Sequence, residues 1–155
     1  ELSSRSIDLD FNVNLIDSRE NYLNNKKRNK ITSIYAKLPW LLVKNLKKDS
    51  FFIILTHSHD HDFKIINEIL NLNNFKFIGL IGSNTKMKKF EKRLLKLGHD
   101  KSLINKIECP IGLKSISSKK PAEISISIIA RLLEYRSLSS SDIKKEPIIF
   151  NKINE

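Results

Sequence analysis

Short apolar runs alternate with segments of helical period along most of this chain, and this alternation is the feature that most restricts its fold. Four runs have the composition of strands and are bounded by turn-forming residues: Phe11–Ile16, Ile31–Tyr35, Phe51–Leu55 and Phe75–Ile81. The third run reads Phe-Phe-Ile-Ile-Leu without polar alternation, which is typical of a strand covered by helices on both faces. We therefore expect it to be a central strand of a parallel sheet.

The segments between these strands carry apolar residues at the spacing of an α-helix. This spacing predicts helices over Pro39–Leu46, Asp60–Leu72 and Asn84–Leu97. Gly98 follows the last of them, in the position where a glycine commonly ends a helix. Strands that alternate with helices in this way predict an α/β protein, with a Rossmann-like, open and mainly parallel sheet that has helices on both faces.

One further helix is expected nearer the C-terminal end. Pro121-Ala122-Glu123 has the composition of a first helical turn, because proline is tolerated there and a carboxylate is favoured by the helix dipole. The residues from Ile124 to Ile128 alternate with period two, as in a strand, but residues 129–134 do not. We therefore interpret the whole stretch as a helix.

The length of 155 residues fits a single compact domain. We expect a Rossmann-like domain over residues 1–136 and a polar, charged tail over residues 137–155. The tail begins with the polar linker Ser137–Ser141, and Pro147–Phe150 is interpreted as either part of a frayed end or one last edge strand.

Composition argues against several classes of function. The net charge of +11 comes from basic residues scattered among asparagine and serine, without the interleaved aromatics that stack on bases, so we expect no nucleic-acid partner. No apolar run approaches the roughly 20 residues that cross a bilayer, so we expect no membrane association. Cys109 is the only cysteine, which excludes an intrachain disulfide and favours a reducing, cytoplasmic setting. We interpret it as a structural thiol.

Asp17 stands directly after the first expected strand, in Ile-Asp-Ser-Arg. In a dinucleotide-binding fold, an acid at this place accepts hydrogen bonds from ribose hydroxyls, and an arginine such as Arg19 can meet a phosphate. The Gly-rich turn that precedes such an acid by about 20 residues is absent from the chain. Either the domain does not bind dinucleotides, or its first strand and phosphate loop lie upstream of Glu1.

The richest polar segment lies at the carboxyl end of the expected central strand, and three interpretations of it stay open. His57, His59 and His61 could hold a divalent metal in a hydrolase, although their spacing is one residue short of the His-x-His-x-Asp-His signature of metallo-β-lactamase-type enzymes. Asp60 or Asp62 could simply cap the following helix. We favour the third interpretation, in which His57 and His59 contact a ligand or carry protons without a metal.

A second polar turn follows the fourth expected strand. Gly82 permits a tight turn there, Ser83 can cap the next helix, and the free N–H groups of the helix start form an anion site. Lys86, Lys88 and Lys89 follow at once and add a positive field. The segment is interpreted either as a phosphate-binding turn or as ordinary helix capping.

Five motifs occur in one order and spacing over residues 1–136. They are Ile16-Asp17-Ser18-Arg19, Thr56-His57-Ser58-His59 with Asp62, Gly79-Leu80-Ile81-Gly82-Ser83 with Lys86 and Phe90, Cys109-Pro110-Ile111-Gly112-Leu113 and Pro121-Ala122-Glu123-Ile124. Together they resemble the C-terminal Rossmann domain of the xanthine dehydrogenase accessory protein family, the XdhC/CoxI group. In that family a strand and a Gly-rich turn precede the part that matches Glu1–Leu9. The resemblance therefore implies a fold that is incomplete on its N-terminal side, with a central sheet edge left unpaired.

The resemblance implies a maturation factor for molybdenum hydroxylases such as xanthine dehydrogenase, and not an enzyme. Such a protein binds the molybdenum cofactor, as molybdopterin or its dinucleotide form, while a cysteine desulfurase supplies sulfur, and it then passes the cofactor to the apo-enzyme. A homo-oligomer is also compatible with the resemblance. The residues carried over as cofactor contacts are Asp17, Arg19, Thr56, His57, His59, Gly82, Ser83, Gly112, Pro121 and Glu123.

Two alternative functions stay open beside the resemblance. The expected fold and Asp17 also suit an NAD(P)-dependent oxidoreductase domain, although no segment after Arg136 is long enough for a second, substrate-bearing domain. The histidine cluster suits a metal-dependent hydrolase. The chain also departs from the family over residues 115–120, which read Ser-Ile-Ser-Ser-Lys-Lys where the family usually has a pair of glycines.

Overall fold

The computed structural model describes residues 1–23 and 29–139, so the expected strand or frayed end at Pro147–Phe150 lies outside the described residues. The strands are β1 (Val13–Asp17), β2 (Ile31–Tyr35), β3 (Ser50–Ile54), β4 (Phe75–Leu80) and β5 (Ile107–Glu108). The α-helices are α1 (Leu2–Ile7), α2 (His59–Leu72), α3 (Asn84–Lys96), α4 (Lys101–Ile104) and α5 (Pro121–Ser139). Two 3-10 helices lie between the strands, namely η1 (Glu20–Tyr22) and η2 (Pro39–Asn45).

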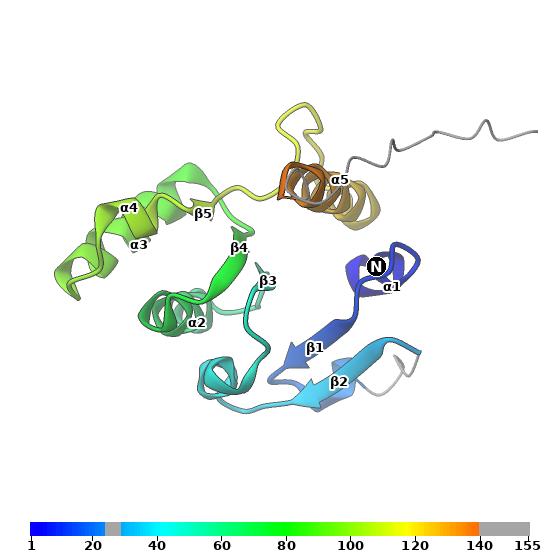
Figure 1. Ribbon diagram of the computed structural model, residues 1–155, viewed down its shortest axis with the longest axis horizontal. Coiled ribbons are helices and arrows are strands. Elements are labelled where there is room, and N and C mark those ends of the chain that lie inside the picture. Colours follow the sequence, from blue (N-terminus) through cyan, green and yellow to red (C-terminus); the bar gives the residue numbers. More distant parts are fainter. Residues whose placement is uncertain (24–28, 140–155) are drawn as a thin grey trace, which may run out of the picture.

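The strands form two parallel sheets. One sheet contains β1 and β2, and the other contains β3, β4 and β5 in that order. β3 is the strand of the second sheet that lies nearest to β1, yet no backbone pairing joins these two strands in the described part of the chain (Figure 1). The expected unpaired edge is therefore confirmed. The expectation of a central strand at Phe51–Leu55 is wrong, because β4 is the strand with a neighbour on each side.

Cover by helices on both faces explains why β3 is continuously apolar although one of its edges is unpaired. Phe52 and Ile54 pack into the cluster that contains α2, while Phe51 and Ile53 pack on the side of α5. Because successive side chains of a strand point to opposite faces, a strand between two helical layers needs apolar residues at every position. An apolar run thus indicates cover on both faces, and not neighbours on both edges.

Two apolar clusters lie on the two faces of the β3-β4-β5 sheet. The larger joins the sheet to η2, α2, α3 and α4, and its members Ile66, Ile78 and Leu94 are fully buried. The smaller joins the sheet to α5 and α1, and it is centred on Phe77 and Ile128. Complete burial of a side chain of this size stabilises a fold by about 1.5–3 kcal/mol, so the two clusters hold the second sheet firmly between its helices.

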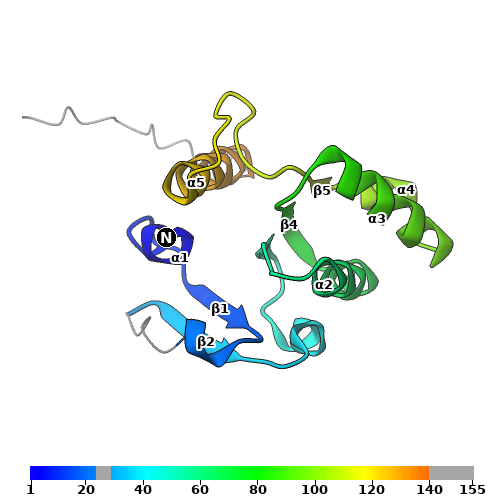
Figure 2. The ribbon, with the colours of Figure 1, turned by 180° about the vertical axis from the view of Figure 1, so that it is seen from behind.

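The first and last helices, α1 and α5, lie side by side and connect the two sheets (Figures 1 and 2). Arg136 of α5 donates a hydrogen bond to the carbonyl oxygen of Leu9 at 2.9 Å, and its guanidinium lies 4.8 Å from the centre of the Phe11 ring. Phe11 meets Phe51 of β3 edge to face, with ring centres 5.9 Å apart. On the opposite face, η2 packs against α2. Helices and side chains, and not strand pairing, therefore attach the β1-β2 sheet to the rest.

Two of the expected helices differ in detail from the helices of the structure. The α-helix expected over Pro39–Leu46 is a 3-10 helix in the structure, η2, and it ends at Asn45. The helix expected from Pro121 is confirmed, but it continues to Ser139, into the expected linker, and the Ser137 hydroxyl donates to the carbonyl oxygen of Leu133 at 2.9 Å. Among the described residues, no helix is both long and apolar enough to cross a membrane.

Candidate functional site

The two sheets diverge at the carboxyl ends of β1 and β3. From β1 the chain continues outward to β2, and from β3 it continues in the other direction to β4 and β5. In open α/β sheets, ligands bind outside the carboxyl ends of the strands at such a switch point. Asp17 is the last residue of β1, and Thr56 and His57 come shortly after β3, so these three expected site residues flank the switch point.

Asp17 and Arg19 form an ion pair at the end of β1. The guanidinium donates from Nε to Oδ1 and from Nη2 to Oδ2, each at 3.0 Å, and the backbone N–H of Arg19 adds a third bond at 2.9 Å. These hydrogen bonds hold the pKa of the Asp17 carboxyl below its usual value, with a smaller contribution from nearby His57. The guanidinium also lies over the Tyr22 ring, 3.8 Å from its centre. The expected ribose acceptor and phosphate contact therefore lie together, with 21% and 39% of their side chains exposed.

His57 and His61 come together at the start of α2, and His59 does not join them. The ring centres of His57 and His61 are 5.5 Å apart, and Trp40 of η2 meets His61 at 5.2 Å. Nδ1 of His61 is buried and has no hydrogen-bond partner in the described part of the chain. Of the two packed histidines His57 and His61, His57 is the exposed one, so a ligand at the switch point can reach it. His59, the first residue of α2, is exposed as well.

The histidine cluster does not have the geometry of a metal centre. Over residues 1–23 and 29–139, no group of three or more His, Cys, Asp or Glu side chains is placed to hold a metal ion. His57 and His61 meet edge to face, which is a packing contact between rings. A hydrolase centred on His57, His59 and His61 therefore has no support in this arrangement.

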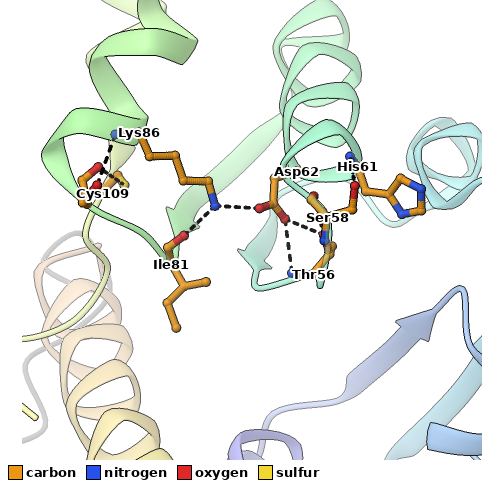
Figure 3. A network of polar contacts seen from close by, with 8 residues as sticks. Thr56, Ser58, His61, Asp62, Ile81, Lys86 and Cys109 are labelled. Atoms are coloured by element: carbon orange, nitrogen blue, oxygen red, sulfur yellow. Dashed lines mark hydrogen bonds and ion pairs between the residues drawn. The ribbon is translucent and has the colours of Figure 1, made fainter. Parts of the chain in front are cut away.

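Asp62 and Lys86 form a buried ion pair that links the ends of β3 and β4 (Figure 3). Nζ of Lys86 lies 2.6 Å from Oδ2 of Asp62 and donates a second bond, at 2.9 Å, to the carbonyl oxygen of Ile81. Oδ1 of Asp62 accepts hydrogen bonds from the hydroxyl and the backbone N–H of Thr56, at 2.7 and 3.2 Å. The Asp62 side chain is fully buried and that of Lys86 is 9% exposed. Lys86 therefore does not add the expected positive field at the surface.

Serine residues cap both helices that follow these strands. Ser58 is the N-cap residue directly before α2, and its side chain accepts a hydrogen bond from a backbone N–H of the first turn at 3.4 Å. The alternative in which Asp60 or Asp62 caps this helix does not hold, because the Ser58 hydroxyl makes the capping bond and Asp62 is buried. Ser83 caps α3 in the same way, as expected, and accepts a hydrogen bond from the backbone N–H of Lys86 at 3.2 Å. Both caps satisfy N–H groups that a helix start leaves without an intrahelical partner.

Two glycines of the expected site make room for neighbouring side chains. A Cβ at Gly82 would lie 2.6 Å from Cδ of Lys86, and a Cβ at Gly112 would lie 2.6 Å from Oγ of Ser127. Gly112 also has a φ of +111°, which a residue with a side chain rarely adopts. Gly82 thus allows Lys86 to pass toward Asp62, and Gly112 allows the loop after β5 to approach α5.

Cys109 lies beside the buried ion pair. Its Sγ donates a weak hydrogen bond to the carbonyl oxygen of Ser83 at 3.8 Å. Burial raises the pKa of the thiol above its ordinary value, and this effect outweighs the opposing influence of nearby Lys86. A thiol with a raised pKa is a poor nucleophile, so the surroundings of Cys109 agree with its interpretation as a structural thiol.

Pro121 and Glu123 begin α5. Pro121 is the first residue of that helix and Glu123 lies in its first turn, as expected. Glu123 pairs with Lys120 at 3.3 Å, and both side chains are exposed. In the described structure, no hydrogen bond or ion pair joins Glu123 to the residues at the ends of β1 and β3.

Sequence reasoning missed the pairing of Asp62 with Lys86, although a signal for it was present. Asp62 lies four residues before Ile66 on the buried stripe of α2, and Lys86 lies four residues before Phe90 on the buried stripe of α3. A charged residue at the first position of an apolar stripe is placed toward the core. Two such residues of opposite charge on neighbouring helices predict a buried pair.

Parallel sheets between helical layers, with polar side chains gathered at the carboxyl ends of their strands, define a Rossmann-like domain. The model of the XdhC Rossmann domain matches residues 1–132, and the chain therefore belongs to that family.

Two similar proteins place this assignment in context. The uncharacterised protein YqeB of Escherichia coli strain K12 is 25% identical over 105 residues, which are 66% of this chain and 18% of YqeB. A crystal structure described as that of a xanthine dehydrogenase from Bacillus halodurans superposes with a TM-score of 0.74 at 23% identity, over 92% of this chain and 43% of that one. The likeness to the Bacillus protein shows a shared fold. The chain spans less than half of the length of either protein.

Proposed function

We propose that this chain forms the cofactor-binding domain, over residues 1–136, of an accessory protein that matures molybdenum hydroxylases such as xanthine dehydrogenase. The domain binds the molybdenum cofactor, as molybdopterin or its dinucleotide form, while a cysteine desulfurase supplies the terminal sulfur. It then passes the cofactor to the apo-enzyme. The protein acts in the cytoplasm as a chaperone and not as an enzyme. Membership of the XdhC Rossmann-domain family supports this role.

The arrangement at the switch point is the observation that carries the proposal. Asp17 and Arg19 lie on one side of it and His57 on the other, close enough for the charge of His57 to act on the Asp17 carboxyl. Partly exposed donors and an acceptor in one place suit a ligand that carries both a phosphate and polar ring substituents. Such a ligand meets Arg19 with its phosphate and His57 with its polar groups.

The unpaired edges of β1 and β3 supply a further part of the proposal. One more parallel strand, placed between β1 and β3, would join the two sheets into one continuous sheet. The turn after that strand would reach the switch point. We assign this place to an apolar strand followed by a Gly-rich turn, whose backbone N–H groups form the main phosphate cradle. Cofactor binding by the 155-residue chain alone is accordingly weak.

An NAD(P)-binding oxidoreductase domain is the second candidate function. Asp17 favours it, because an acid at the end of this strand accepts hydrogen bonds from the hydroxyls of a nucleotide ribose. NAD and molybdopterin therefore compete for the same switch point under the two hypotheses, and direct competition between them tells the hypotheses apart.

The test is a titration of molybdopterin against two purified forms, with NAD as the competitor. One form is the 155-residue chain, and the other is extended upstream by a strand and a Gly-rich turn. A His57→Ala variant of the extended form probes the switch point. His99→Ala is its matched control, because His99 lies between α3 and α4 and bonds to Asn67 of α2 at 2.8 Å.

The proposal expects selective binding of molybdopterin by the extended form, weaker binding by the His57→Ala variant and unchanged binding by the His99→Ala variant. Selective binding of NAD would favour the oxidoreductase domain. Binding of neither ligand would contradict a cofactor-binding role and would leave a scaffold that recognises its partner enzyme.

A further inference from the structure

We propose that Asp62 and Lys86 form a positioning pair, which holds the chain segments that follow β3 and β4 in the geometry that the cofactor site requires. The inference rests on the proposed function, since it assigns these residues a role in shaping the same site. Neither residue is offered as a ligand contact, because both are buried. Their action is on the segments that carry Thr56, His57 and Ser83.

The hydrogen bonds of the pair reach the backbone of both segments. Asp62 accepts from the Thr56 N–H and hydroxyl, which sets the direction of the chain directly before His57. Lys86 donates to the carbonyl oxygen of Ile81, which sets the direction of the chain directly before Gly82 and Ser83. The bond of 2.6 Å between the two charges then fixes one segment relative to the other.

A third segment joins the same network through Ser83. Its carbonyl oxygen accepts from the Cys109 thiol, which lies in the chain that follows β5. Gly82 is part of the arrangement as well, because any side chain there would meet the Lys86 stem at 2.6 Å. The buried ion pair thus joins the segments after β3 and β4, and the Cys109 thiol links the segment after β5 to Ser83 (Figure 3).

Helices α2 and α3 do not need this pair to stay together. Phe63 of α2 meets Phe90 of α3 edge to face, with ring centres 5.3 Å apart, and the guanidinium of Arg93 lies 3.7 Å from the centre of the Phe63 ring. The fully buried Ile66 and Leu94 belong to the same cluster. Ring contacts and apolar packing therefore hold the two helices together. What Asp62 and Lys86 add is hydrogen bonds to backbone atoms that follow β3 and β4.

The energetics of buried charges point to position rather than stability as the role of the pair. Removing two charges from water costs about as much as their mutual attraction returns, so an apolar replacement of both is often neutral for the fold. Removing one partner leaves an uncompensated charge in the core and is strongly destabilising. Only simultaneous neutralisation of both residues therefore separates the positioning role from the stability of the domain.

The test is amide hydrogen exchange in the 155-residue chain and in the double variant Asp62→Asn with Lys86→Met. Asparagine keeps an acceptor for Thr56, and methionine keeps the length of the lysine stem. The matched control is Asp60→Asn with Lys64→Met, which removes the exposed pair of the same helical turn. A second variant, Asp62→Glu, retains both charges but displaces the carboxylate by one methylene group.

The proposal expects exchange at the amides of Ser58 and Ile81 to be faster by about tenfold in the double variant, while the amides of Ile66–Leu70 keep their rates. Asp62→Glu gives the same local pattern, and the control pair leaves all rates unchanged. Uniform acceleration over the strand ends and the α2 interior would show a purely stabilising role and overturn the proposal. Unchanged rates at the strand ends would overturn it as well.

A ligand arm separates this inference from the proposed function. In the upstream-extended form, the double variant is expected to weaken molybdopterin binding by about tenfold, because a site must be held closely to its productive geometry. If the unaltered extended form binds no molybdopterin, the proposed function fails, while the exchange experiment still decides whether the pair positions the strand ends. Undiminished binding by the double variant would overturn the positioning role and leave the proposed function standing.

Discussion

The two sheets of this molecule are held in different ways. Every residue of β1 and β2 is at least partly exposed, whereas Phe77–Leu80 of β4 is buried throughout. The charged pair at the end of β1 stays near the surface, with Arg19 39% exposed, and the pair behind the ends of β3 and β4 is enclosed, with Asp62 fully buried. The β1-β2 sheet therefore contributes less buried surface to the stability of the domain than the β3-β4-β5 sheet does.

This difference follows from how far helices and apolar clusters cover each sheet. The β3-β4-β5 sheet is covered on both faces by helices and buries two apolar clusters. The β1-β2 sheet contributes no residue to the buried members of either cluster, and its edge beside β3 is unpaired in the described structure. The same kind of substitution should therefore cost far more in the second sheet than in the first.

The largest effect is expected from Asp62→Ala, in comparison with Asp17→Ala. Loss of Asp62 leaves the ammonium of Lys86 buried without its partner, which should lower the free energy of unfolding by about 3–5 kcal/mol. Loss of Asp17 leaves a guanidinium that water can reach, so the expected change is only about 0–1 kcal/mol. Urea unfolding followed by circular dichroism measures both. Equal losses would show that the two pairs do not differ as burial predicts.

A smaller difference is expected from Ile78→Ala and Ile34→Ala, which remove the same atoms from the two sheets. Ile78 is fully buried in β4, so its truncation should cost about 2–5 kcal/mol through lost transfer energy and a new cavity. Ile34 of β2 is only half-buried, and its truncation should cost about 1 kcal/mol. The same unfolding experiment measures the two values. A larger loss for Ile34→Ala would reverse the comparison.

The smallest effect concerns the pH dependence of the β1 region and uses Arg19→Met. Hydrogen bonds from Arg19 depress the pKa of Asp17 in the folded state, so their contribution to stability is present above the ordinary aspartate pKa of about 4 and is lost as the pH falls through the depressed value. The variant lacks this contribution, and it should melt below the unaltered protein at neutral pH. The difference in melting temperature should shrink in acid, where Asp17 is protonated in both proteins.

Thermal unfolding of the two proteins between neutral and acidic pH measures this effect. Direct titration of the Asp17 carboxyl by NMR should show its pKa rise in the variant. A difference in melting temperature that does not change with pH would mean that Arg19 stabilises the fold through its contact with Tyr22 and not through Asp17.

Much of the candidate site could be predicted because it consists of local features of the chain. Asp17 at a strand end, Ser83 at a helix start and Pro121 in a first helical turn each follow from a few consecutive residues. Their positions reflect strand and helix signals that the backbone obeys without distant partners. The capping residue of α2 could not be chosen from the sequence, because Ser58 and the two aspartates are all residue types that cap helices.

The pairing of Asp62 with Lys86 could be derived only in part, because their places on apolar stripes direct both toward the core without showing that they meet. The two residues are 24 positions apart, and their meeting depends on how α2 and α3 lie against one sheet. The sequence also did not show that His59 stays apart from His57 and His61, because the spacing of three histidines does not determine which rings pack together.

By itself, the amino-acid sequence determined the alternation of strands and helices, the two-sided apolar cover of β3 and the polar residues that end the strands. These properties are local, since side-chain period and capping chemistry act over a few residues. Only the tertiary structure decided that β4, and not β3, has a neighbouring strand on each side, and that Asp62 and Lys86 are buried together. Both results depend on contacts between segments that are distant in the sequence. For the ion pair, the physical reason is the cost of removing charge from water, which makes each buried charge require its partner.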